Sequence, residues 1–113
     1  MANFDVLDPM TAVVELPIPE PVIIYPRMKF EDWKDYFIQK RNKTTVTAEK
    51  LNYNECFKTL LYAELCNAEL IKVGNSTLSS NLAVKFTLKI SDYDCLKVFQ
   101  ANMNIVTVVS KLF

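Results

Sequence analysis

The chain has 113 residues, half of them apolar, which is enough for one domain with a sizeable core and too little for two. Its 13 basic and 13 acidic residues give a formal net charge of zero, so no overall field favours nucleic acid or an anionic membrane. Histidine is absent, which excludes Ser-His and Cys-His catalysis and removes the commonest metal ligand.

The cysteines and the start of the chain favour a reduced compartment. Cys56, Cys66 and Cys95 are widely spaced and support neither a zinc site nor a disulfide framework. The first residues lack the basic start and apolar core of a signal peptide, and no apolar run is long enough to span a bilayer. We therefore expect a cytoplasmic protein with no membrane partner. Abundant lysine and asparagine with few arginines are typical of an AT-rich genome, which favours a viral or phage origin and hence the host cytoplasm.

Residues 1–27 form an extended N-terminal arm that is apolar but interrupted by prolines. Prolines at positions 17, 19 and 21 remove the backbone donors from one edge of an extended chain, whereas residues 18, 20 and 22 keep theirs on the other edge. Such a segment is not expected in the middle of a sheet. We expect it to dock by one edge, either on the chain's own fold or on a neighbouring subunit.

Two helices are predicted after the arm. Aromatic residues at helical spacing indicate a helix over about residues 29–41. A second helix has Thr47 as a plausible N-cap, and its apolar surface is wide enough for a central position. We favour its end near Asn67, followed by a strand over residues 69–73, although the helical pattern can also be continued to a stop at Gly74.

The stretch from residue 82 to residue 90 alternates apolar and other side chains, which predicts a strand with one buried face. The residues of that face are Leu82, Val84, Phe86, Leu88 and Ile90. Ser91 and Asp94 then form a capping-box pattern at the start of a third helix. Residues 104–113 fit a helical period, but their β-branched run favours a strand.

These elements predict an α+β fold with a small antiparallel sheet packed with two to three helices and preceded by the proline-punctuated arm. We assign residues 1–27 to the arm and residues 28–113 to a single α+β domain that folds without it. The expected core includes Leu60, Leu65, Phe86, Leu88 and Phe99.

The leading functional hypothesis is a non-enzymatic interaction or assembly protein, an adaptor or inhibitor that binds another protein or its own copies as a homo-oligomer. The arm carries more apolar surface than an edge strand of so small a sheet can bury, and tryptophan and tyrosine are enriched in interface hot spots. The predicted partner-binding residues are Val14, Leu16, Ile18, Val22, Ile24, Tyr25, Trp33 and Tyr36.

Two alternatives use other residues. A weak nucleic-acid-binding protein would hold phosphates with Lys40, Arg41 and Lys43 beside the aromatic helix. A metal-dependent enzyme would hold a divalent cation with Asp92 and Asp94, which follow a strong strand. Asp-x-Asp is a common tripeptide, no phosphate-binding glycine loop accompanies it, and capping of a helix by Ser91 and Asp94 is the favoured interpretation. We therefore predict no enzyme, no catalytic residue, no metal and no cofactor.

Overall fold

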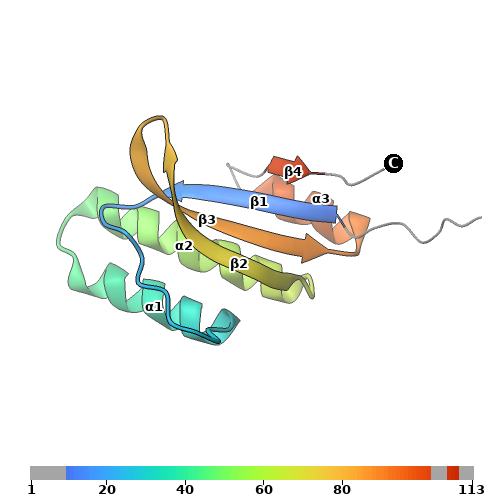
Figure 1. Cartoon of the computed structure of the whole chain (residues 1–113), viewed down its shortest axis with the longest axis horizontal. Coiled ribbons are helices and arrows are strands. Elements are labelled where there is room, and N and C mark those ends of the chain that lie inside the picture. Colours follow the sequence, from blue (N-terminus) through green and yellow to red (C-terminus); the bar gives the residue numbers. More distant parts are fainter. Residues whose placement is uncertain (1–9, 103–106, 110–113) are drawn as a thin grey trace, which may run out of the picture.

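The computed structural model describes residues 10–102 and 107–109, and it has the predicted α+β architecture. A four-stranded antiparallel sheet packs against three helices, of which α1 and α2 run side by side along one face of the sheet (Figure 1). In chain order the elements are β1 (Met10–Pro17), α1 (Phe30–Lys43), α2 (Thr47–Leu65), β2 (Glu69–Leu78), β3 (Asn81–Ile90), α3 (Tyr93–Asn102) and β4 (Thr107–Val109).

The N-terminal arm supplies strand β1, which lies inside the sheet in the order β2-β3-β1-β4. β1 pairs with β3 along its whole length, and with β4 through residues 11–13. The expectation that this stretch stays out of the middle of a sheet is therefore wrong for residues 11–13. The physical reason is that Pro17, Pro19 and Pro21 all lie beyond the three β4 pairs, where no missing donor disturbs that ladder. Of the two predicted ways of docking, the described residues show docking on the chain's own fold.

Side chains of β1 and β3 alternate between a buried and an open face of the sheet. Ala12, Val14 and Leu16 stand opposite Leu88, Phe86 and Val84, and all six are buried. The opposite face carries Glu15, Lys85 and Thr87 among others, and the helices do not lie on it. The predicted buried face of β3 is confirmed except at Leu82, which is 40% exposed because it lies near the projecting β2–β3 turn.

Helix α2 ends at Leu65, as the favoured sequence interpretation requires, and β2 follows at Glu69. Asn67 stops the helix with a left-handed φ of 54°, while the Ala68 N–H donates to the Ala63 carbonyl at 3.0 Å, in the manner of a Schellman motif. Leu65 was expected in the core but is 68% exposed, because it lies on the side of α2 opposite the buried Cys56, Leu60 and Ala63.

The starts of two helices differ in detail from the predicted caps. Val46 is the N-cap of α2 and Thr47 is its first helical residue, while the Thr44 hydroxyl accepts the Val46 N–H at 3.2 Å. At α3 the capping side chain belongs to Asp92 and not to Ser91. Its carboxylate accepts the N–H groups of Asp94 and Cys95 at 2.9 and 3.2 Å.

Of the predicted C-terminal strand over residues 104–113, Thr107–Val109 forms β4, and the remainder lies outside the described residues. The boundary drawn at residue 27 does not separate two structural parts, because β1 belongs to the sheet of the domain. Ile18 and Val22 add further buried side chains to the same core.

The buried face of β3 can be tested by paired substitutions. Phe86 is fully buried and its ring centroid lies 5.8 Å from that of Phe37, so Phe86→Ala should lower the free energy of unfolding by about 3–5 kcal/mol. The neighbouring Lys85 points to the open face, so Lys85→Ala should change the free energy of unfolding by less than about 0.5 kcal/mol. Urea unfolding measures both, and equal small effects would show that the face is assigned wrongly.

The β2–β3 turn carries backbone strain that can be removed. Ser79 and Ser80 have φ values of 52° and 68° between the paired residues Leu78 and Asn81, and a two-residue turn of this kind favours Asn-Gly. The double substitution Ser79→Asn with Ser80→Gly should raise the free energy of unfolding by about 1 kcal/mol. Ser91→Gly, at an exposed serine outside the left-handed region, is the control and should give no gain.

Candidate interaction surface

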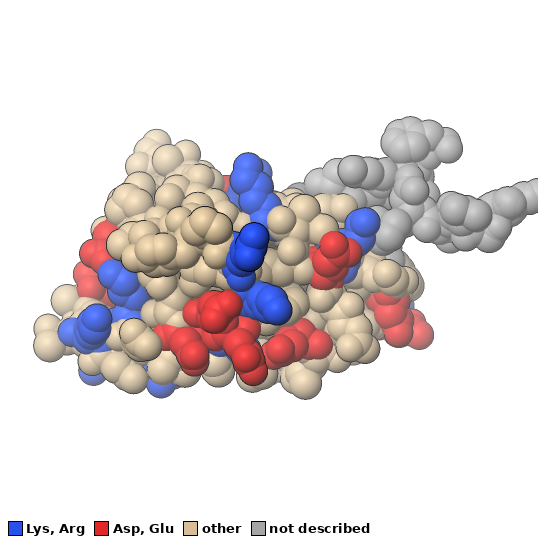
Figure 2. All heavy atoms as spheres, turned by 60° about the horizontal axis from the view of Figure 1, so that its bottom comes forward, with Lys and Arg blue, Asp and Glu red and all other residues tan. Residues whose placement is uncertain are grey.

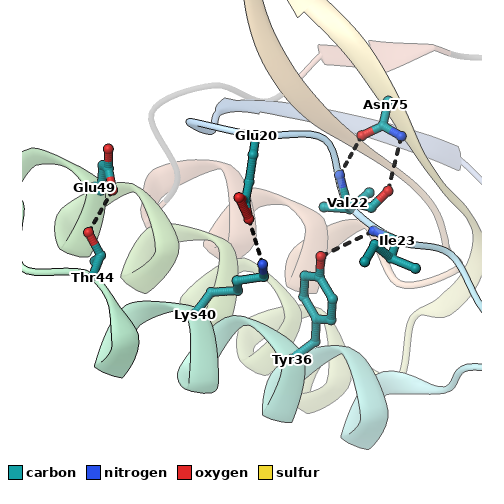
Figure 3. Close-up of polar contacts among 8 residues, drawn as sticks. All are labelled: Glu20, Val22, Ile23, Tyr36, Lys40, Thr44, Glu49 and Asn75. Carbon is teal, nitrogen blue, oxygen red and sulfur yellow. Dashed lines mark hydrogen bonds and ion pairs between the residues drawn. The ribbon is translucent and has the colours of Figure 1, made fainter.

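The part of the arm that follows β1 is fixed to the domain by hydrogen bonds from the backbone N–H groups that the prolines do not remove. The Ile18 N–H donates to the Leu82 carbonyl at 3.1 Å. The Val22 N–H donates to Asn75 Oδ1 at 2.7 Å, and Asn75 Nδ2 donates to the Val22 carbonyl at 3.2 Å (Figure 3). The Asn75 amide thus takes the place of a neighbouring strand. Residues 18 and 22 use the donors that the proline spacing was predicted to leave available.

Helix α1 holds the same segment from the other side. The Ile23 N–H donates to Tyr36 Oη at 3.1 Å, and Lys40 Nζ forms an ion pair with Glu20 at 2.6 Å (Figure 3). The hydrogen bond to Glu20 raises the pKa of Lys40 above its ordinary value. Contacts to β2 and α1 therefore fix the backbone at residues 20–23, although the segment has no regular secondary structure.

Immediately after these anchors the chain presents large apolar side chains to the outside. Ile23, Ile24 and Tyr25 are 54%, 51% and 59% exposed. On β2, Ile71 is the extra residue of a β-bulge, because Leu70 pairs with Leu88 and Lys72 with Thr87, and it is 49% exposed. Exposed apolar side chains gathered on a rigid surface are typical of interaction sites.

A groove of about 370 Å³ lies between this segment and β2, and we call it the arm groove. Its walls come from residues 24–28 and from residues 70–73, and Trp33 of α1 also lines it. Trp33 is 2% exposed and its ring contacts that of Tyr36 edge to face at a centroid distance of 5.4 Å. The groove therefore has half-exposed apolar side chains in its walls and a buried aromatic ring, that of Trp33, in its lining.

The eight predicted partner-binding residues fall into two groups. Those that contribute to the protein's own core are Val14, Leu16, Ile18 and Val22, each at most 6% exposed. Burial removes these four side chains from the surface that a partner can reach. Ile24, Tyr25 and Trp33 line the arm groove, and Tyr36 supports it through its hydrogen bond to Ile23.

The predicted nucleic-acid residues are mostly engaged within the protein. Lys40 is paired with Glu20, and Arg41 Nη1 donates to Asn54 Oδ1 at 2.8 Å. Lys43 is exposed, at a second groove of about 490 Å³ whose lining also includes Glu20 and Glu49. On the face shown in Figure 2, acidic and basic side chains lie next to one another among wide uncharged areas. This arrangement provides no concentrated positive field there.

Asp92 has a structural role, and burial changes the ionisation of two other titratable side chains. Asp92 caps α3, and no group of three or more metal-ligating side chains occurs within the described part of the chain. Burial, followed by the charge of Glu20, raises the pKa of Tyr53 to about 12, so this hydroxyl stays protonated at neutral pH. Burial likewise raises the pKa of the Cys56 thiol well above its usual value.

Comparisons with protein-family models, with curated proteins and with solved structures find no match to this chain. Among the described residues, no helix combines the length and the apolar character needed to cross a membrane.

Sequence reasoning missed Asn75 and Ile71. We expected this strand to end at residue 73 and Asn75 to lie in the turn-rich stretch that follows, but β2 continues to Leu78 and contains Asn75. Asparagine is depleted in strands, and for this reason the local pattern placed it outside the strand. The exposure of Ile71 depends on a bulge, and a bulge arises from pairing with β3, which the local pattern does not specify.

The Asn75 amide should be the main anchor of the arm. Asn75→Ala removes both hydrogen bonds to the buried Val22 and leaves its N–H and carbonyl without those partners, so the free energy of unfolding should fall by about 1–3 kcal/mol. Hydrogen exchange at the Val22 and Ile23 amides should accelerate. Thr77→Ala, at an exposed position of the same strand, is the matched control. Unchanged amide protection in Asn75→Ala would show that other contacts hold the segment.

Proposed function

We propose that this chain is a non-enzymatic interaction protein that binds another protein, or a second copy of itself, through the arm groove. The single observation that carries the proposal is the fixed presentation of exposed Ile24 and Tyr25 beside Ile71, directly after a segment anchored by Asn75 and Tyr36. Binding to a preformed surface avoids the entropic cost of ordering a loop.

The composition of the groove supports a protein partner. Its lining is mainly apolar and includes tyrosine, tryptophan and arginine, the residue types that dominate interface hot spots. Its volume of about 370 Å³ is suited to one or two apolar side chains of a partner. The zero formal net charge also leaves self-association without overall charge repulsion.

The nucleic-acid alternative has less support. Two of its three cations are already paired with Glu20 and Asn54, and Trp33 is too buried to stack on a base. The enzyme alternative loses Asp92 to helix capping. We therefore retain the interaction protein as the proposed function.

The test is a charge placed in the groove. Ile24→Lys and Tyr25→Lys should weaken binding to the partner or to a second copy about tenfold or more, because each puts a cation where an apolar contact is proposed. Leu51→Lys is the matched control, since Leu51 is 62% exposed on α2 and lies outside the groove lining. Light scattering of the purified full chain reports self-association, and cross-linking in native-host extract reports a partner.

Point substitutions are preferable to deletion of residues 1–26, because β1 contributes to the core and its removal should unfold the domain. The thermal midpoint of each variant must stay close to that of the parent chain. If Ile24→Lys and Tyr25→Lys weaken binding no more than Leu51→Lys does, the arm groove is not the binding site.

A further inference from the structure

Two cysteines that are distant in sequence meet at one end of the helical layer. Cys66 is the C-cap of α2 and Cys95 lies in the first turn of α3. The Cys66 Sγ donates a weak hydrogen bond to the Cys95 carbonyl oxygen at 3.5 Å. Both residues are partly exposed, whereas Cys56 is fully buried.

The neighbouring Cys95 also affects the ionisation of the Cys66 thiol. The pKa of the Cys66 thiol is raised to about 12, first by burial and then by a hydrogen bond and a charge interaction with the Cys95 side chain. This thiol is therefore protonated at neutral pH, in agreement with its role as the donor to the Cys95 carbonyl.

The backbone on both sides of the pair is fixed. The Cys66 N–H donates to the Tyr62 carbonyl at 3.0 Å, inside the motif that ends α2. The Cys95 N–H donates to the capping carboxylate of Asp92 at 3.2 Å. The 3.5 Å contact between Cys66 Sγ and the Cys95 carbonyl oxygen brings the two residues together, and a disulfide between them requires such proximity.

We propose that Cys66 and Cys95 form a reversible disulfide that links the end of α2 to the start of α3. The inference is independent of the arm groove and of the function proposed for it. The sequence spacing gave no indication of this pair, because 28 residues that include the β2–β3 hairpin separate the two cysteines and only the folded chain brings them together.

The oxidant is a low-molecular-weight disulfide of the glutathione class. The Cys95 sulfur attacks it, one glutathione thiol leaves with the Cys95 proton, and a mixed disulfide forms. The Cys66 sulfur then attacks the Cys95 sulfur, and its proton passes to the departing sulfur, so that the second glutathione leaves as a thiol. The two protein thiols lose two electrons in total, one oxidised glutathione becomes two reduced molecules, and excess reduced glutathione reverses both steps.

The expected consequence is a more stable fold with α3 held in place. A cross-link that closes a loop of this length restricts the unfolded chain and should raise the thermal midpoint on the order of 10 °C. The effect should disappear after reduction.

The experiment incubates the purified full chain with oxidised glutathione, followed by thermal unfolding and by peptide mass mapping without reduction. We expect an intramolecular link between the peptides of Cys66 and Cys95, and its loss in Cys66→Ala and Cys95→Ala. Cys56→Ala is the matched control and should still form the link, because Cys56 is not part of the pair.

Three results would overturn the proposal. These are thiols that remain free under oxidant, stable glutathione adducts that do not resolve to the internal bond, and cross-links that join two chains in place of two helices. A bond that forms but leaves the thermal midpoint unchanged would confirm the chemistry and refute its stabilising role.

Discussion

The pairing of β1 with β3 is the constraint on which the rest of the structure depends. It brings the inward side chains of Ala12, Val14 and Leu16 against those of β3, and together they form the buried face on which the helices pack. The same pairing sets where the arm leaves the sheet after Pro17. From that point the Asn75 amide and the Tyr36 hydroxyl direct the segment along β2 and α1. The arm groove is thus a consequence of the register between two strands.

Local patterns were sufficient for most of the fold. The aromatic spacing in α1, the alternation in β3 and the polar stretch that separates α1 from α2 are periodic or compositional signals, and these elements formed where their signals lie. Leu65 and Leu82 show the limit of this reasoning. Both continue an apolar period, yet Leu65 lies on the side of α2 that faces away from the core and Leu82 lies near the projecting β2–β3 turn. A period alone does not reveal which of its positions are packed.

The candidate site was only partly predictable for the same physical reason. An apolar side chain on an extended arm can bind a partner or fill the protein's own core, and the sequence pattern is the same in both cases. The side chains at positions 14, 16, 18 and 22 are buried in the protein's own core. Ile24 and Tyr25 are exposed, and they differ from those four residues in that they follow the last anchoring contact, at Ile23. That anchor is a hydrogen bond to a helix and the Asn75 contact spans 53 positions, so neither could be read from neighbouring residues.

The order in which the chain is synthesised gives the prolines a second importance. β1 is made first, but the strand it pairs with along its whole length begins near residue 81, so about 70 residues must follow before pairing is complete. At a synthesis rate of roughly 5–20 residues per second, an apolar strand waits unpaired for several seconds. Such strands are templates for aggregation, and prolines next to them interrupt that growth. The prolines at 17, 19 and 21 thus stand where they can limit misassociation of the nascent chain.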